Sequence, residues 1–180
     1  VLVGKCLALG YKVVVLDNFM YSETSLLYFC DNPNLEIIRG DCRNETLIKK
    51  LVSKVDAVIP LACLVGAPLC DEFPIESESI NLDSIQLLLN CLSSSQKLVF
   101  PCTNSGYGVG ETDLFCTEKS PLRPVSLYGR MKVDAESRIL NTRNGITLRL
   151  ATVFGVSPRM RMDLLVNDFT YKALKERAIV

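Results

Sequence analysis

Tyr128 and Lys132 form the sequence pattern with the clearest chemistry. They stand four residues apart in Tyr-Gly-Arg-Met-Lys, and on a helix that spacing places a phenol and an ammonium on one face. A nearby cation favours the phenolate and is expected to lower the tyrosine pKa from its usual value of about 10, so that Tyr128 can act as a base. The same spacing recurs at Tyr171 and Lys175, so spacing alone does not choose between the two pairs.

The segment before Tyr128 favours the first pair. Residues 101–108 (PCTNSGYG) follow an apolar run of strand length at residues 98–100. Ligands of open α/β sheets bind at the carboxyl ends of strands, where Thr103 could hydrogen-bond a substrate hydroxyl together with Tyr128. Tyr171 has no such partner segment, and we expect it to pack.

Composition excludes several other chemistries. The chain has no histidine, which excludes Ser-His-Asp and Cys-His catalysis and HExxH zinc sites. Its eight cysteines never form CxxC; we expect reduced thiols, no metal site and a cytoplasmic location. With 20 basic and 20 acidic side chains, the chain lacks the net positive charge that a nucleic acid or an anionic membrane would require, and we expect neither as a partner. The longest uncharged stretch, residues 57–70, is too short to span a bilayer.

The elements that must position these residues alternate along the chain. Apolar runs predict strands, and segments with helical spacing predict the helices between them. The expected strands are residues 12–16, 35–38, 57–61, 98–100 and 146–150, and the expected helices are residues 45–52, 79–92, 127–140 and 163–176. This alternation predicts an α/β fold with a doubly wound parallel sheet.

The two ends differ from a complete fold of this class. Residues 1–9 are predicted to form the first helix, with Gly10 as its stop, so the strand and turn expected before it are missing. At the other end, residues 178–180 resemble the start of a strand. We therefore expect a fragment of a longer protein, truncated at its first strand and in its C-terminal region.

Two aspartates follow predicted strands, and each has two interpretations. In a dinucleotide-binding fold, Asp17 would accept hydrogen bonds from an adenosine ribose, and the absence of a neighbouring arginine favours NAD over NADP. Alternatively, Asp17 caps a turn. Asp41 could accept from the adenine amino group, or could cap the helix that begins near Arg43.

Seven motifs together resemble one family, because they occur in its order and spacing. They are VVVLDNF (13–19), RGDCRN (39–44), DAVIPLAC (56–63), Asn81 in INLDS, CTNSGYG (102–108), YGRMK (128–132) and LRLATVFG (148–155). The chain is similar to the extended short-chain dehydrogenase/reductases, and in particular to the NAD-dependent nucleotide-sugar epimerase/dehydratase family. The resemblance covers nearly the whole chain and implies a Rossmann-like fold, NAD as cofactor and a nucleotide-sugar substrate.

The resemblance also implies roles for individual residues. Thr103, Tyr128 and Lys132 match the catalytic positions, with Tyr128 as base and Lys132 on the nicotinamide ribose. The matched cofactor-binding positions, in addition to Tyr128 and Lys132, are Asp17, Asn18, Phe19, Asp41, Cys42, Leu61, Ala62, Cys63, Asn81 and Ala151. The matched substrate-binding positions are Thr103, Asn104, Ser105, Tyr128, Thr152 and Asn167. Residues 1–155 would form the NAD-binding domain, without its first strand and glycine loop, and residues 156–180 the beginning of the substrate-binding region.

Departures from the family pattern narrow the reaction. Dehydratases of the family carry two acids after the threonine, whereas this chain has Asn104 and Ser105, so dehydration is disfavoured. The leading interpretation is an epimerase that works through a transient keto-sugar. Alternatives are a reductase, dehydrogenase or decarboxylase on a nucleotide sugar, or a non-catalytic nucleotide-binding fragment. A homodimer through residues 79–92 and 127–140 is expected by family analogy.

Overall fold

The computed structural model describes residues 1–22, 24–110, 115–142 and 145–177. The chain divides into two compact units. Unit 1 combines Val1–Arg39 with Thr152–Val180, and unit 2 is Gly40–Ala151. The strand expected at residues 178–180 lies outside the described residues.

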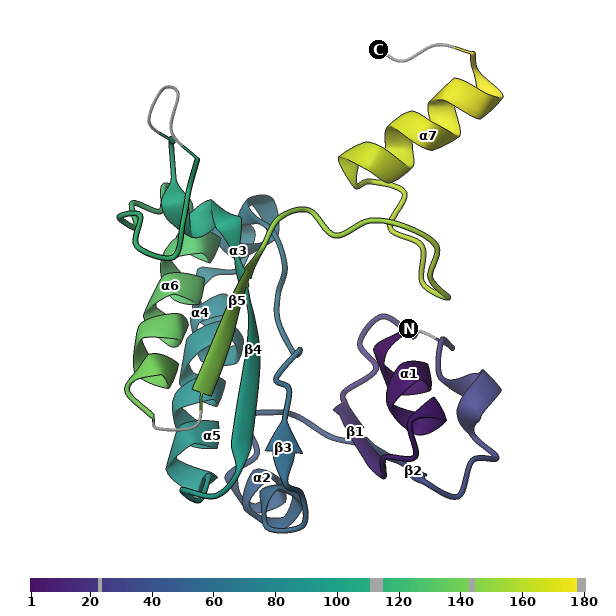
Figure 1. The fold of residues 1–180 in the computed structure, drawn as a ribbon, viewed down its shortest axis with the longest axis vertical. Coiled ribbons are helices and arrows are strands. Elements are labelled where there is room, and N and C mark those ends of the chain that lie inside the picture. Colours follow the sequence, from purple (N-terminus) through teal and green to yellow (C-terminus); the bar gives the residue numbers. More distant parts are fainter. Residues whose placement is uncertain (23, 111–114, 143–144, 178–180) are drawn as a thin grey trace. The chain divides into compact units, whose positions relative to one another are not determined.

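Unit 1 contains two parallel strands and the helices around them. Its elements are α1 (Leu2–Ala8), β1 (Val13–Asp17), the 3₁₀ turn η1 (Leu27–Phe29), β2 (Leu35–Arg39) and α7 (Leu165–Lys175) (Figure 1). Strands β1 and β2 pair in parallel, from Val13 opposite Leu35 to Asp17 opposite Arg39. Gly10 follows α1 with a φ of 83°, a left-handed conformation that glycine adopts without strain, which confirms it as the expected stop.

Unit 2 contains a three-stranded parallel sheet and most of the helices. Its elements are α2 (Glu45–Val52), β3 (Ala57–Val58), α3 (Ala67–Glu72), α4 (Pro74–Glu78), the π-helical turn η2 (Ser79–Asp83), α5 (Ser84–Cys91), β4 (Lys97–Thr103), η3 (Asn104–Tyr107), α6 (Leu127–Leu140) and β5 (Gly145–Leu150). The strand order is β3-β4-β5. Helices α4, α5 and α6 lie along one face of β4 and β5 (Figure 1). The predicted α/β class with parallel strands is confirmed.

The helix starts of unit 2 follow capping rules. The side chain of Asn44 accepts a hydrogen bond from Leu47 N at the start of α2. The side chain of Ser126 accepts one from Gly129 N at the start of α6. A side-chain oxygen at these positions satisfies an amide that has no partner within the helix, which is why both helices begin where the sequence predicts.

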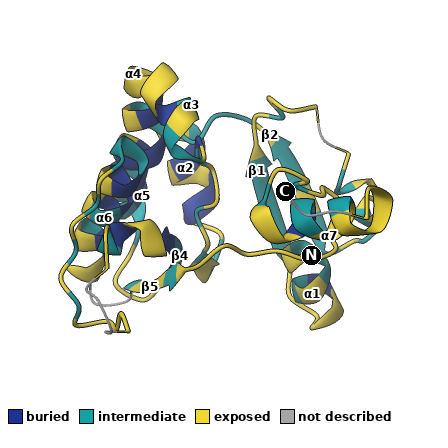
Figure 2. Ribbon diagram, turned by 90° about the horizontal axis from the view of Figure 1, so that it is seen from above, coloured by how far each residue is buried: buried dark blue, intermediate teal, exposed yellow. Residues whose placement is uncertain are grey.

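The core of the described structure lies mainly in unit 2 (Figure 2). Along β4 the side chains of Leu98, Phe100 and Cys102 are buried, and they alternate with more exposed residues, as the two-residue period of a strand requires. On α6, Ala135 and Ile139 are fully buried, so the sheet and helix close a continuous apolar layer. Burial of this area is the main stabilising contribution to the unit.

Two sequence-based expectations need correction. The strand expected at residues 57–61 is only Ala57–Val58, because Pro60 has no amide proton to donate to a ladder. The helix expected at residues 79–92 is part of a longer helical stretch that begins at Pro74 and is preceded by α3. Pro68 and Pro74 both stand in first helical turns, where proline is tolerated, so they start helices here rather than interrupt them.

None of the described helices is long and apolar enough to cross a membrane. All eight cysteines are free thiols, and Cys70 and Cys102 are buried.

Candidate active site

The centre of the candidate site is the contact between the end of β4 and the first turns of α6. Two glycines permit this contact. A Cβ on Gly106 would lie 2.9 Å from Val133 Cγ2, and a Cβ on Gly129 would lie 3.4 Å from Ser105 O. The helix that carries Tyr128 and Lys132 therefore packs directly on the turn that follows Thr103.

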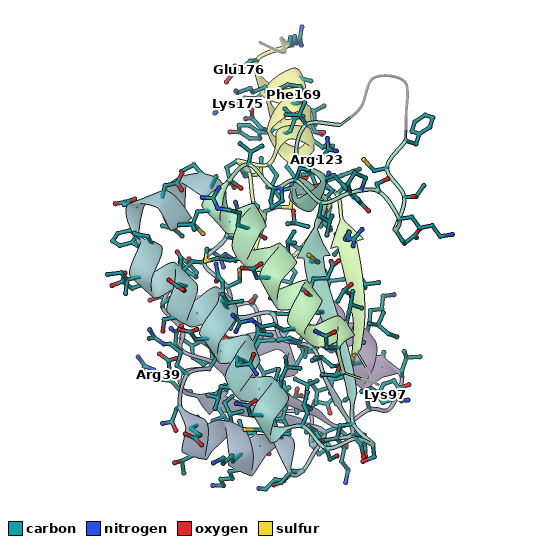
Figure 3. The ribbon with its side chains drawn as sticks, turned by 90° about the vertical axis from the view of Figure 1, so that its left-hand side faces the viewer. Arg39, Lys97, Arg123, Phe169, Lys175 and Glu176 are labelled. Atoms are coloured by element: carbon teal, nitrogen blue, oxygen red, sulfur yellow. The ribbon has the colours of Figure 1, made fainter. Side chains whose placement is uncertain are left out.

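Thr103 ends β4 and caps the turn η3. Its Oγ1 accepts a hydrogen bond from Ser105 N at 3.2 Å and donates to Ser105 Oγ at 3.1 Å, and the residue is buried. Arg123 N donates to Gly106 O, and a Cβ on Gly108 would lie 2.0 Å from Arg123 O. Figure 3 shows Arg123 and Lys97, which begins β4, at opposite ends of unit 2. The turn is therefore held closely at the carboxyl end of the strand, while Asn104 and Ser105 are exposed.

Lys132 is a buried cation without a carboxylate partner. Only 6% of its surface is exposed, and its Nζ lies 3.8 Å from the centroid of the Phe100 ring. Among the described residues it forms no ion pair and its Nζ donates no hydrogen bond. Burial lowers the pKa of the Lys132 ammonium, because desolvation disfavours the charged form. The ring face of Phe100 compensates part of that cost by a cation–π contact.

Tyr128 is half-buried against the apolar cluster formed by Leu64, Cys70 and Met131. Burial raises its phenol pKa well above the ordinary value, and the thiols of Cys63, Cys102 and Cys70 add to the effect. The expectation that Lys132 lowers the pKa of Tyr128 is therefore wrong for the protein without a bound cofactor. The physical reason is that desolvation dominates and the ammonium of Lys132 faces Phe100.

The second Tyr-x-x-x-Lys pair has a different environment. Tyr171 is 44% exposed on α7, and Lys175 Nζ lies 5.1 Å from its ring centroid. The pKa of Lys175 is raised by its hydrogen bond with Tyr171 rather than lowered by burial. Figure 3 shows Lys175 and Glu176 at the carboxyl end of α7. With the same spacing, Lys132 of the first pair is buried, whereas Lys175 and Tyr171 of the second pair are exposed.

Asn81 holds the backbone of the segment that follows β3. It is buried in the π-helical turn η2, accepts from Leu64 N at 2.8 Å and donates to Leu64 O at 2.9 Å. Cys63 and Cys70 donate to the same carbonyl oxygen, each at 3.4 Å. Sequence reasoning placed Asn81 beside the cofactor but missed this clamp on the neighbouring segment. The only signal in the sequence was an asparagine between two apolar residues, Ile80 and Leu82.

The residues that the clamp positions have different exposures. Leu61 and Ala62 are exposed, whereas Cys63 is half-buried. Burial raises the pKa of the Cys63 thiol to about 11, so this thiol is neutral near neutral pH. The three residues are predicted to run along the cofactor, and that role stays a prediction.

Asp41 makes an ion pair with the side chain of Arg43. Its Oδ1 also accepts a hydrogen bond from the backbone amide of Arg43 at 2.8 Å. Hydrogen bonding from the Arg43 side chain lowers the pKa of Asp41 to about 2. The cap of α2 is Asn44 and not Asp41, so the helix-capping alternative is wrong. Cys42 is half-buried, and burial raises the pKa of its thiol.

The remaining cofactor and substrate positions lie in or beside unit 1. Asp17 Oδ1 accepts from Phe19 N at 2.7 Å, and Asn18 Oδ1 accepts from Met20 N at 3.0 Å, so both residues stabilise the turn after β1. Phe19 has a φ of 55° in that turn. Ala151 and Thr152, exposed residues after β5, are the boundary between the units. The turn-capping interpretation of Asp17 is thus observed, and its Oδ2 makes no hydrogen bond to described residues.

Asn167 is buried at the start of α7. Its Oδ1 accepts from Gly155 N at 3.2 Å, and its Nδ2 donates to Arg161 O at 2.9 Å. Both ends of the amide therefore tie the preceding loop to the helix. The predicted contact with a nucleotide diphosphate stays a prediction.

The donor set at Lys132 fits a nicotinamide ribose. Because the buried Lys132 ammonium has no carboxylate partner in the described part of the chain, its donors could serve two ribose hydroxyls. Within the described ranges, no group of three acidic, cysteine or histidine side chains is arranged to hold a metal ion. Proton transfer by Tyr128 and hydroxyl binding by Thr103 stay predictions.

Comparison with known proteins identifies relatives over the whole chain. A model described as the NAD dependent epimerase/dehydratase family matches residues 1–180. A UDP-glucuronic acid decarboxylase 4 from Arabidopsis thaliana is 25% identical over 190 residues, which cover 99% of this chain and 42% of that protein. A UDP-glucose 4-epimerase 2 from the same plant is 31% identical over 137 residues, 71% of this chain and 39% of that protein. The chain thus spans less than half the length of these relatives.

Solved structures show the same fold. A UDP-glucose 4-epimerase from Thermotoga maritima, solved with UDP-glucose, has a TM-score of 0.82 at 23% identity over 96% of this chain and 58% of that chain. A dTDP-glucose 4,6-dehydratase from Bacillus anthracis, solved with NAD, has a TM-score of 0.81 at 22% identity over 97% of this chain and 57% of that chain. These similarities confirm the Rossmann-like fold.

Proposed function

This chain belongs to the NAD-dependent epimerase/dehydratase family, and we propose that the whole protein is an NAD-dependent epimerase of a nucleoside-diphosphate sugar. The observation that carries the proposal is the buried Lys132, which has no carboxylate partner among the described residues and lies one helical turn from Tyr128, on the helix that packs against the Thr103 turn. In this proposal Tyr128 is the base and Lys132 the ribose-binding cation of a site that uses no imidazole. The cofactor and substrate roles assigned to the other site residues are part of the same proposal.

Each residue has a defined task in this proposal. Tyr128 Oη takes the proton from the sugar hydroxyl that is oxidised and returns it when the hydroxyl is restored. Thr103 Oγ1 holds the same hydroxyl oxygen in place. Lys132 donates hydrogen bonds to the nicotinamide ribose, and these orient the cofactor. The Lys132 ammonium also brings a positive charge towards the phenol of Tyr128. NAD, when bound, supplies a reversible acceptor for the electron pair that leaves the sugar carbon.

The raised pKa of Tyr128 gives the bound cofactor a second part to play. A phenol whose pKa lies well above 10 is protonated near neutral pH, and a protonated phenol is not a base. The positive nicotinamide ring would favour the phenolate, as any nearby cation does. We therefore expect Tyr128 to become a competent base only in the NAD-loaded protein, which protects the site from unproductive proton transfer.

Asn104 and Ser105 favour epimerisation over dehydration. Elimination of water from a keto-sugar needs one group to remove a proton and another to protonate the departing hydroxyl. Carboxyl groups perform these steps well, whereas an amide and a hydroxyl with ordinary acidity do not. Both side chains are exposed at the start of η3, directly after Thr103.

Decarboxylation is the second candidate. A UDP-glucuronic acid decarboxylase covers 99% of this chain, more than the 71% covered by the epimerase relative. When the carbon next to the ketone carries the carboxylate (a β-keto acid), its C–C bond breaks, carbon dioxide leaves and the electron pair forms an enolate with the ketone, so this step needs no carboxyl side chain at positions 104 and 105. Oxidation of the sugar hydroxyl, with NAD as the electron acceptor and the same roles for Tyr128 and Lys132, would precede it.

One experiment separates the two candidates. The full-length protein, loaded with NAD, is incubated with UDP-glucose, UDP-N-acetylglucosamine and UDP-glucuronic acid, and the products are separated by chromatography. Epimerisation predicts inverted sugars with no carbon dioxide. Decarboxylation predicts a pentose product and one carbon dioxide for each uronic acid consumed. No conversion of these and the corresponding dTDP-, GDP- and CDP-sugars would overturn both proposals.

The two tyrosine-lysine pairs provide matched variants. Tyr128→Phe is expected to lower kcat by about 10²- to 10⁴-fold, the usual contribution of a positioned acid or base. Tyr171→Phe removes the same atom from the exposed pair and should leave kcat unchanged. Equal activity of the two variants would contradict the role of Tyr128.

A further inference from the structure

Behind the catalytic pair, unit 2 holds an ion pair that the proposed chemistry does not use. Glu136 on α6 is 2% exposed and pairs with Arg149 on β5. Arg149 Nε donates to Glu136 Oε1 at 2.9 Å and to Oε2 at 3.2 Å, and Nη2 also donates to Oε1. Removing carboxylates from water is costly, so a buried pair of this kind needs a reason other than net stability.

The same guanidinium also binds the turn beside Thr103. Arg149 Nη1 donates to Tyr107 Oη at 3.3 Å and to Glu118 O at 3.2 Å, and its Cζ lies 5.2 Å from the centroid of the Tyr107 ring. Tyr107 belongs to η3, the turn that Thr103 caps. One side chain therefore joins helix α6, strand β5, turn η3 and the segment around Glu118.

The strand register places this junction next to the catalytic threonine. In the β4–β5 pairing, Cys102 lies opposite Arg149 and Thr103 lies opposite Leu150. The buried Cys102 thiol donates to Lys132 O at 3.5 Å. Burial is the main cause that raises the pKa of this thiol, and its interaction with Glu136 adds to the effect. On α6, residues 128, 132 and 136 follow at intervals of four and share one face. The ion pair is thus one turn beyond Lys132 on the face that carries Tyr128.

We propose that Glu136 and Arg149 are positioning residues that fix the rotation of α6 relative to β4 and η3, so that Tyr128 and Thr103 meet the same substrate hydroxyl. This inference rests on the proposed function. A fork of guanidinium hydrogen bonds resists rotation in a way that apolar packing does not, because its donors have fixed directions. Productive proton transfer depends on such alignment, and small misplacements reduce rates strongly.

Two sets of variants separate positioning from stability. Arg149→Lys keeps the charge but loses the fork, and the double variant Glu136→Leu with Arg149→Met replaces the pair by apolar side chains of similar size. An apolar replacement of a buried ion pair often preserves or raises stability, so the double variant is expected to fold even if a single variant does not. Glu45→Gln is the matched control, because Glu45 pairs with Lys49 on the exposed face of α2.

The variants are made in the full-length protein loaded with NAD, and kcat and KM are measured on the nucleotide sugar that it converts. We expect Arg149→Lys and the double variant to lower kcat by about tenfold or more, with KM changed by less than about threefold, the pattern of an interaction needed in the transition state. Glu45→Gln should change neither. A double variant with the parent's melting temperature and kcat within about twofold of the parent would overturn the inference.

A second readout does not require substrate. The phenol of Tyr128 is titrated by ultraviolet absorbance, as the difference between each protein and the same protein carrying Tyr128→Phe. Because burial is the main cause of its raised pKa, rotation of α6 should admit water and lower this pKa towards the ordinary value. An unchanged titration in both Arg149→Lys and the double variant would overturn the inference. If the parent converts no nucleotide sugar, the proposed function fails, and this titration still tests the positioning role.

Discussion

The two units of the chain hold their functional side chains in different ways. In unit 2, Thr103, Lys132 and Asn81 are buried and are surrounded by a continuous core. In unit 1, the described residues include only two buried ones, Leu7 and Asn167. The residues expected to transfer protons thus lie in the part with the extensive core, whereas the expected ribose-binding residue Asp17 lies in the part with little core of its own.

The polar contacts show the same contrast. Asn81 binds Leu64, 17 residues away, and Arg149 binds Glu136, 13 residues away. Asp17 and Asn18 bind amides two residues away. The geometry of unit 2 is therefore a property of the folded sheet and helices, whereas the turn of unit 1 is set largely by its local sequence. Three tests, in order of effect, examine this contrast.

The largest expected effect comes from truncating one core residue in each unit. Ile139→Ala removes a fully buried side chain on α6 and is expected to lower the free energy of unfolding by about 4 kcal/mol. Leu7→Ala on α1 should cost about 2 kcal/mol, because fewer neighbours surround the cavity. Urea unfolding of both variants measures the difference. A larger loss at Leu7 would contradict the assignment of the main core to unit 2.

A smaller effect is expected from the two buried asparagines. Asn81→Ala leaves the amide and carbonyl of Leu64 without side-chain partners in a buried region and should cost about 2–3 kcal/mol. Asn167→Ala releases Gly155 N and Arg161 O, which belong to an exposed or partly exposed loop where water can replace the side chain, and should cost about 1 kcal/mol. The same unfolding measurement applies. Equal losses would remove the distinction between the two clamps.

The smallest expected effect is the acid sensitivity of the Asp41–Arg43 pair. In the folded protein the pKa of Asp41 is about 2, below its ordinary value of 3.8. The stabilising contribution of the pair is therefore complete above about pH 4 and is lost as the pH falls towards 2. The side chain of Asp41 is 37% exposed, so solvent screening limits the contribution to less than about 1 kcal/mol.

The variant Asp41→Asn measures this contribution. The difference in unfolding free energy between parent and variant should shrink from pH 6 to pH 3 and also in high salt. Asp163→Asn, in the more exposed pair with Arg161 of unit 1, should show a smaller difference. A difference that grows as the pH falls would contradict the sign of the Asp41 shift.

Much of the fold could be predicted because its signals are local. Helices α2 and α6 begin and end at the expected residues, since capping side chains and apolar spacing lie within the helices or next to them. Strands β1, β2, β4 and β5 were found within a few residues. The Tyr128 and Lys132 pair was also found from local spacing, and its context at the end of β4 separated it from Tyr171 and Lys175.

The rest depends on contacts between distant residues. Lys132 lies over the ring of Phe100 only because β4 and α6 pack together. The pKa of Tyr128 is raised by burial in the folded protein, which the four-residue spacing in the sequence does not indicate. The pairing of Glu136 with Arg149 depends on the β4–β5 register. The early start of the helix at Pro74 was missed because proline indicates an interruption as often as a beginning.

The π-helical turn Ser79–Asp83 makes the helical stretch from Pro74 to Cys91 sensitive to the deletion of a residue. A π turn bonds each amide to a carbonyl five residues back and thus contains one residue more than the α turn it replaces. Deleting one residue here would replace the π turn by an α turn and would redirect the side chains within the turn, while the α-helical segments on either side would keep their faces. Asn81 would then turn away from Leu64. A deletion is therefore expected to be as damaging here as the loss of the asparagine itself.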